Sequence, residues 1–176
     1  MSHVTFETSS PQPAPFTGPA LFGLGFRPFY LLAAAFAAVS VPLWVAAQAG
    51  IAVPARIDLL WHMHEMVFGF ALAIVVGFLY TAGYNWTQLW TPRGGALAAI
   101  AGLWIAGRAA MLAAPPVAAA AIDFAFLPVA TLPLYLVLKR SGNRRNMFLV
   151  LLLSLLALAN GQVARHARVT SPRRFQ

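Results

Sequence analysis

The sequence predicts an all-α fold, a polytopic transmembrane bundle of about five spanning helices. Of its 176 residues, 60% are hydrophobic and only 9% are charged, whereas soluble domains carry about 25% charged residues. Such a chain has too little polar surface to cover a globule in water, so its expected partner is a lipid bilayer. The apolar runs are continuous and do not alternate with period two, which favours helices over the strands of a barrel.

The chain divides into three predicted parts. Residues 1–20 are polar and proline-rich, and we expect a disordered cytoplasmic leader because nothing in them can build a core. Residues 21–163 form the transmembrane helical domain, and residues 164–176 form a basic tail. A spanning helix needs roughly 20 mostly apolar residues, and the runs of that length predict spans near residues 29–49, 59–83, 95–114, 117–138 and 146–163.

Helix-breaking residues and one basic turn separate these spans. Pro28 suits the first turn of the first helix, where its missing N–H costs nothing. Pro54 interrupts the first connection and Pro92 the second. The pair at residues 115–116 is two prolines, which predicts a tight connection and an antiparallel hairpin of the third and fourth spans. Residues 139–145 form a short basic turn before the last span.

The net charge of +8 does not indicate nucleic-acid binding, because the basic residues lie in short loops rather than along one polar face. We call the side of the membrane that holds the N-terminus side one. Side one then holds six basic residues: Arg27, Arg93, Lys139, Arg140, Arg144 and Arg145. Before the tail, side two holds two: Arg56 and Arg108. This asymmetry predicts a cytoplasmic N-terminus, although four arginines of the tail would level the count. The absence of cysteine excludes disulfides and thiolate metal sites.

The most informative motif is Trp61-His62-Met63-His64-Glu65, which places ionisable groups at the start of a long apolar run. Such groups usually mark a ligand, ion or proton site. In a regular helix His62 and His64 point about 160° apart, so they cannot bind one ion together. His62 and Glu65 share a face and form one candidate site, whereas His64 needs partners elsewhere. Neutral imidazole suits iron, copper and zinc; the alternative for each ring is a hydrogen bond to a neighbouring carbonyl.

Two further charges lie inside predicted spans. Arg108 precedes Pro115 by seven residues, and Asp123 follows Pro116 by seven. Both therefore lie roughly 10 Å below the turn, which predicts an Arg108–Asp123 ion pair with either a structural or a functional role. Each charge alone would cost about 2.5–3.5 kcal/mol. Outside this region, we expect Arg27 to anchor to lipid headgroups.

The polar residues stand in motifs that resemble those of the NnrS family. The similar segments are residues 24–29 (LGFRPF), 61–70 (WHMHEMVFGF), 77–82 (GFLYTA) with 85–87 (NWT), 103–108 (LWIAGR) and 123–128 (DFAFLP). The resemblance runs from about residue 20 to 160. It implies a multi-pass protein of the bacterial inner membrane that contains haem, copper or both. The family is linked to nitric oxide response, denitrification and protection from nitrosative stress, so nitric oxide or its metal adducts are implied ligands.

The resemblance also assigns candidate residues. It makes His62 and His64 candidate haem or metal ligands, and Glu65 a member of the same metal site or a proton acceptor. Arg27, Asn85, Arg108 and Asp123 match motif positions without an assigned role; for Asn85, capping of its helix and contact with a ligand both stay open. No catalytic residue is assigned.

The family pattern fades after Asn160, and residues 161–176 are basic and unpatterned. We expect a truncated or frameshifted gene product, the alternative being a genuine short member with a basic tail. Two other functions remain open. One is a non-catalytic membrane scaffold or inactive fragment, in which polar residues only lock helices together. The other is a transporter or proton channel with a polar track of His62, Glu65, Arg108 and Asp123.

Overall fold

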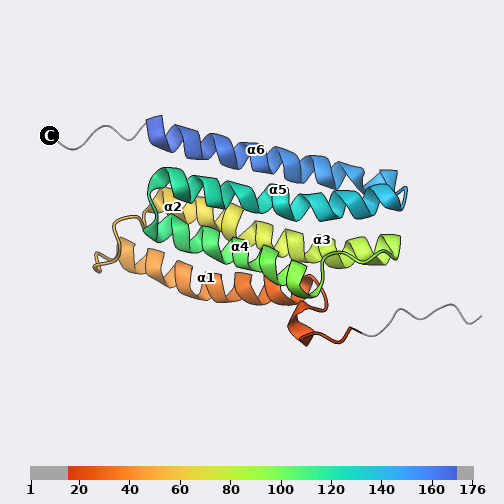
Figure 1. Cartoon of the computed structure of the whole chain (residues 1–176). Coiled ribbons are helices and arrows are strands. Elements are labelled where there is room, and N and C mark those ends of the chain that lie inside the picture. Colours follow the sequence, from red (N-terminus) through yellow and green to blue (C-terminus); the bar gives the residue numbers. More distant parts are fainter. Residues whose placement is uncertain (1–15, 170–176) are drawn as a thin grey trace, which may run out of the picture.

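Five long apolar helices make up most of the computed structural model, which describes residues 16–169 and the side chains of residues 16–162 (Figure 1). The predicted all-helical membrane fold is confirmed, since these helices are long and apolar enough to span a bilayer and no strand occurs in the described ranges. Most of the predicted leader and the last residues of the predicted tail lie outside the described residues.

The five spans lie close to their predicted positions. The first is α1 (Phe26–Gln48). The second is Leu59–Thr87, made of α2 (Leu59–His64), the π-helical η2 (Glu65–Ala71) and α3 (Leu72–Thr87). The remaining spans are α4 (Gly94–Ala113), α5 (Pro116–Arg140) and α6 (Met147–Val169), and the short 3-10 turns are η1 (Ala20–Phe22) and η3 (Arg144–Asn146). Helix α6 continues past residue 163, so the predicted tail begins as helix.

Local sequence explains where several helices begin and end. Asp58 caps α2, and its carboxylate accepts a hydrogen bond from the backbone N–H of Trp61 at 2.7 Å. Pro116 opens α5, where a missing N–H is tolerated. Helix α3 ends at Gln88, whose φ of 56° is left-handed. Gly142, at φ 68°, turns the chain between α5 and η3, a conformation that glycine adopts without strain.

Helix α5 is central in the bundle, since it packs against α3, α4 and α6, while α1 packs against α3 and α4. The helices run side by side, with α1 and α6 on opposite outer faces (Figure 1). Alternating directions give the bundle two ends. The side-one end holds the beginnings of α1, α4 and α6; the side-two end holds the beginnings of α2 and α5 and the end of α4.

Small residues let helices approach closely around an aromatic core. A β-carbon on Gly77 would lie 2.8 Å from Cβ of Phe29, so α1 and α3 touch where glycine leaves room. The ring of Phe29 packs edge-on against Tyr80, at 6.3 Å between centroids. The Tyr80 hydroxyl donates to the carbonyl of Ala130 at 2.7 Å and ties α3 to α5. Large apolar side chains such as Leu60, which is 71% exposed, cover the outside and suit contact with lipid.

Candidate functional site

Five polar side chains from four spans meet in the interior near the side-two end. We call them the polar cluster: His64, Glu65, Arg108, Asp123 and Asn160. Glu65 is fully buried, and Arg108, Asp123 and Asn160 are between 3% and 7% exposed. The beginning of the second span, the end of α4, the beginning of α5 and the later part of α6 supply them. Charges buried so deeply are tolerated when they are paired and hydrogen-bonded.

Arg108 lies at the centre of the polar cluster. Its Nη2 donates to Oδ1 of Asp123, which confirms the predicted ion pair. Its Nη1 donates to Oε2 of Glu65, so one guanidinium holds carboxylates from two different helices. The planar fork of arginine suits such double contact, because its donors point in fixed directions.

Asn160 completes the polar cluster and was missing from the predicted site. Its Nδ2 donates to Oδ2 of Asp123 at 2.8 Å, and its Oδ1 lies 2.9 Å from Nε2 of His64. The sequence did carry a signal for it, because a lone amide in an apolar membrane helix needs a polar partner. What the sequence could not supply was the identity of that partner.

The hydrogen-bond directions bring two unpartnered atoms together between His64 and Glu65. Since Asn160 Oδ1 is an acceptor, Nε2 of His64 carries the hydrogen in that bond. In a neutral ring, Nδ1 is then an acceptor that faces Oε1 of Glu65 at 3.4 Å. Neither atom has a hydrogen-bond partner among the described residues. The polar cluster thus combines two carboxylates with one guanidinium.

The π-helical segment η2 shapes the space around Arg108. A β-carbon on Gly69 would lie 2.5 Å from Arg108 Nη1 and 2.8 Å from Glu65 Oε2, so glycine makes room for this ion pair. The carbonyl of Gly69 accepts a hydrogen bond from the indole N–H of Trp104 at 3.0 Å. Single π-turns inside α-helices often mark functional positions. The hydrophobic periodicity of the sequence does not indicate this one.

The structure gives His62 and Glu65 different neighbours, and the shared site of these two residues stays a prediction. The two histidines do point apart, as helix geometry required, but His64 rather than His62 lies beside Glu65. The imidazole of His62 stacks on the ring of Trp44 in α1, at 4.1 Å between centroids and 11° between planes. The reason is competition: Arg108 holds the Glu65 carboxylate, and α1 offers His62 an aromatic face.

The remaining predicted residues lie at the other end of the bundle. Arg27 is exposed, and its Nη1 donates to the carbonyl of Ala20 at 2.6 Å. Asn85 is exposed near the end of α3, where its backbone carbonyl accepts from the side chain of Gln88 at 3.0 Å. Gln88 rather than Asn85 takes the capping position of that helix. Neither Arg27 nor Asn85 contributes to the polar cluster.

The described residues contain no group of three His, Cys, Asp or Glu side chains arranged to hold a metal ion. Metal binding by His62, His64 and Glu65 therefore stays a prediction. The Nε2 atom of His64 is engaged by Asn160, and its Nδ1 faces Glu65. His62 differs, because its side chain forms no hydrogen bond or ion pair among the described residues, and its Nδ1 is buried. Both ring nitrogens of His62 are therefore unused within the described part of the chain.

Comparison with known proteins gives one result. The family model described as NnrS protein matches the sequence over residues 20–173, which includes every residue of the polar cluster. The matched range continues beyond Asn160, so the expectation that the family pattern ends there was wrong. No curated protein and no solved structure is detectably similar to the chain.

Proposed function

Because this chain belongs to the NnrS family, we propose that it is a haem- or copper-binding membrane protein of the nitric oxide response. The proposed setting is the bacterial inner membrane, with the N-terminus in the cytoplasm. The proposed ligand is nitric oxide or a metal adduct of it, in denitrification or in protection from nitrosative stress. When bound, haem or copper would supply a redox-active centre that coordinates nitric oxide.

The proposal rests on the imidazole of His62, which is stacked on a tryptophan and has a buried nitrogen without a hydrogen-bond partner among the described residues. Its ring is held flat against Trp44, which fixes the orientation of the imidazole. A buried ring nitrogen without a partner is costly, so a hydrogen-bond acceptor, a donor or a metal ion would stabilise this position. His64, the other candidate ligand, already contacts Asn160 and Glu65 in the polar cluster.

The donor set fits haem better than copper. The porphyrin itself supplies most ligands of haem iron, so one imidazole from the protein would be sufficient to hold the group. Copper needs several protein donors, and the described residues bring no such group together. His62 would therefore be the residue that holds a haem. Copper at the same residue would need donors supplied from outside the described part of the chain.

The test is the optical spectrum and metal content of the whole chain, purified in detergent from cells supplied with haem precursor and copper. We expect a Soret band and iron in the wild type, and loss of both in His62→Ala. Leu60→Ala is the matched control, since Leu60 lies on the same helix and is 71% exposed. Circular dichroism verifies that both variants keep their helices. Wild-type protein without a Soret band, iron or copper would overturn the proposal.

A second function is the helix-locking scaffold. It is favoured because the members of the polar cluster bond to one another. Arg108, Asp123 and Asn160 pair with one another or with the second span, so four spans are tied together without any ligand. The scaffold predicts that His64→Ala lowers stability and that the wild-type protein itself carries no haem signal. A proton channel is disfavoured, because the ionisable groups inside the described spans are concentrated near the side-two end.

A further inference from the structure

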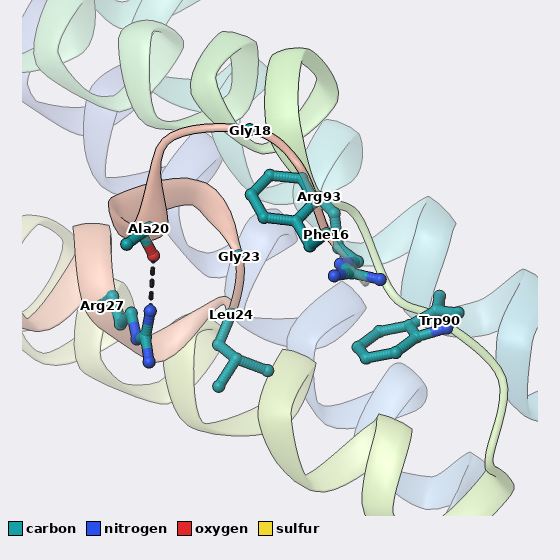
Figure 2. A pocket seen from close by; sticks show the side chains of 8 residues that line it. All are labelled: Phe16, Gly18, Ala20, Gly23, Leu24, Arg27, Trp90 and Arg93. Carbon is teal, nitrogen blue, oxygen red and sulfur yellow. Dashed lines mark hydrogen bonds between the residues drawn. The ribbon is translucent and has the colours of Figure 1, made fainter. Parts of the chain in front are cut away.

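A second site stands at the opposite end of the bundle from His62 and the polar cluster. A cavity of about 340 Å³ opens between the segment around η1 and the connection from α3 to α4 (Figure 2). Its lining combines three apolar side chains, two arginines and small residues: Phe16, Leu24 and Trp90, Arg27 and Arg93, and Gly18, Ala20 and Gly23. Cavities of about 300–1,000 Å³ are typical of small-molecule sites.

The cavity is positively charged and has no carboxylate of its own. Neither Arg27 nor Arg93 forms an ion pair within the described residues. The acidic residues described in the structure are Asp58, Glu65 and Asp123, and all of them lie toward the side-two end. Two arginines at one cavity without an internal counterion favour an anion from outside the chain.

The guanidinium of Arg93 is held in place by aromatic rings. Its Cζ lies 3.6 Å from the ring centroid of Trp90 and 4.6 Å from that of Phe16 (Figure 2). Trp90 is itself stacked on Tyr84, at 3.9 Å between centroids. Stacking fixes the plane of a guanidinium while leaving its N–H groups at the edge free to donate. The Nε of Arg93 is buried and has no hydrogen-bond partner in the described part of the chain.

Arg27 contributes from the other side of the cavity. Its Nη1 donates to the carbonyl of Ala20, which orders the η1 turn and orients the guanidinium (Figure 2). An arginine has five N–H donors, and this bond uses only one of its nitrogens. Helix α4 begins at Gly94, directly after Arg93, without a side-chain cap. The positive end of its dipole therefore adds to the field near Arg93.

We propose that this cavity binds a phosphate group, carried either by an anionic lipid or by a free phosphate ion. Phosphate accepts several charge-assisted hydrogen bonds, and arginine is the side chain best shaped to donate them. The apolar walls of Phe16, Leu24 and Trp90 suit the organic part of a lipid. The cavity lies where α1 and α4 begin. This position suits a lipid headgroup, because tryptophan and arginine are typical of the membrane interface.

The test uses the whole chain in detergent and phosphate-free buffer, with native mass spectrometry as the readout. The probes are dioctanoyl phosphatidic acid, dioctanoylglycerol with the same chains but no phosphate, and inorganic phosphate. The bound mass identifies the source of the phosphate. We expect phosphatidic acid, inorganic phosphate or both to bind, and dioctanoylglycerol to bind at least about tenfold more weakly than phosphatidic acid, since charged hydrogen bonds are lost.

Variants separate this site from general positive charge. Arg93→Gln should weaken binding of the phosphate probe about tenfold or more, and Arg93→Lys should restore part of it. Arg145→Gln is the matched control, because Arg145 is exposed on the same side of the bundle and does not line the cavity. Equal binding of phosphatidic acid and dioctanoylglycerol without phosphate binding, or equal losses in Arg93→Gln and Arg145→Gln, would overturn the proposal. Circular dichroism verifies that each variant is folded.

Discussion

The guanidinium of Arg108 occupies the space in which a side chain at Gly69 would begin. A β-carbon there would lie 2.5 Å from Arg108 Nη1 and 3.3 Å from the ring of Phe36. The absence of a side chain at one position of η2 thus permits the ion pair between Arg108 and Glu65. Three helical segments meet at this point, since Gly69 lies in η2, Arg108 in α4 and Phe36 in α1.

Gly69→Ala should therefore destabilise the protein by about 1–3 kcal/mol, the usual cost of adding volume to a packed interior. Gly102→Ala is the matched control, because a β-carbon on Gly102 meets nothing within 4 Å. That control should be neutral or stabilising by up to about 1 kcal/mol, since alanine favours helix more than glycine. Unfolding in mixed detergent micelles, followed by circular dichroism, measures both. Equal stabilities of the two variants would contradict the contact.

Arg108→Met should cost about 3–5 kcal/mol, because it leaves the Glu65 and Asp123 carboxylates buried without their counterion. The triple variant Arg108→Met, Glu65→Gln, Asp123→Asn should recover much of this loss, since it removes the unpaired charges. The same unfolding assay compares them. A triple variant no more stable than Arg108→Met alone would show that unpaired charge is not the cause.

Asn160→Leu should destabilise the bundle by about 1–3 kcal/mol, because Oδ2 of Asp123 and Nε2 of His64 lose a partner in the interior. The control on the same helix is Ser154→Ala, whose exposed hydroxyl bonds only to the carbonyl of Val150. It should change stability by less than about 0.5 kcal/mol. Similar values for the two variants would argue against a structural role of Asn160.

Trp104→Phe should cost about 1 kcal/mol or more, since the carbonyl of Gly69 loses the indole donor while a ring remains to pack on Phe36. Trp86→Phe provides the comparison, because Trp86 is 38% exposed at the other end of the bundle. Thermal unfolding of both variants in the same detergent gives the difference. A larger loss in Trp86→Phe would be the opposite of this expectation.

The number and place of the spans could be predicted, because lipid forces each crossing segment to be long, apolar and helical. The Arg108–Asp123 ion pair could also be predicted from the sequence. The two proline residues that join α4 to α5 fix a tight hairpin, so equal spacing from the turn gives equal depth. In both cases the information is local in the chain.

The rest of the polar cluster depends on how helices distant in sequence rotate against one another. The positions of α4 and α1 relative to the second span decide which partners its side chains find. Glu65 pairs with Arg108 of α4, and His62 stacks on Trp44 of α1. The π-turn after Glu65 shifts the register of this span in a way that a regular helix does not anticipate. The contact of Asn160 with His64 and Asp123 likewise requires α6 to lie beside α5.

The position of Asn160 on α6 has a consequence for how the bundle is made. Helix α6 is synthesised after the other four spans. Oδ2 of Asp123 therefore lacks its amide donor until α6 has entered the membrane. Arrival of α6 would then supply the amide donor to Asp123 and tie this helix to α5.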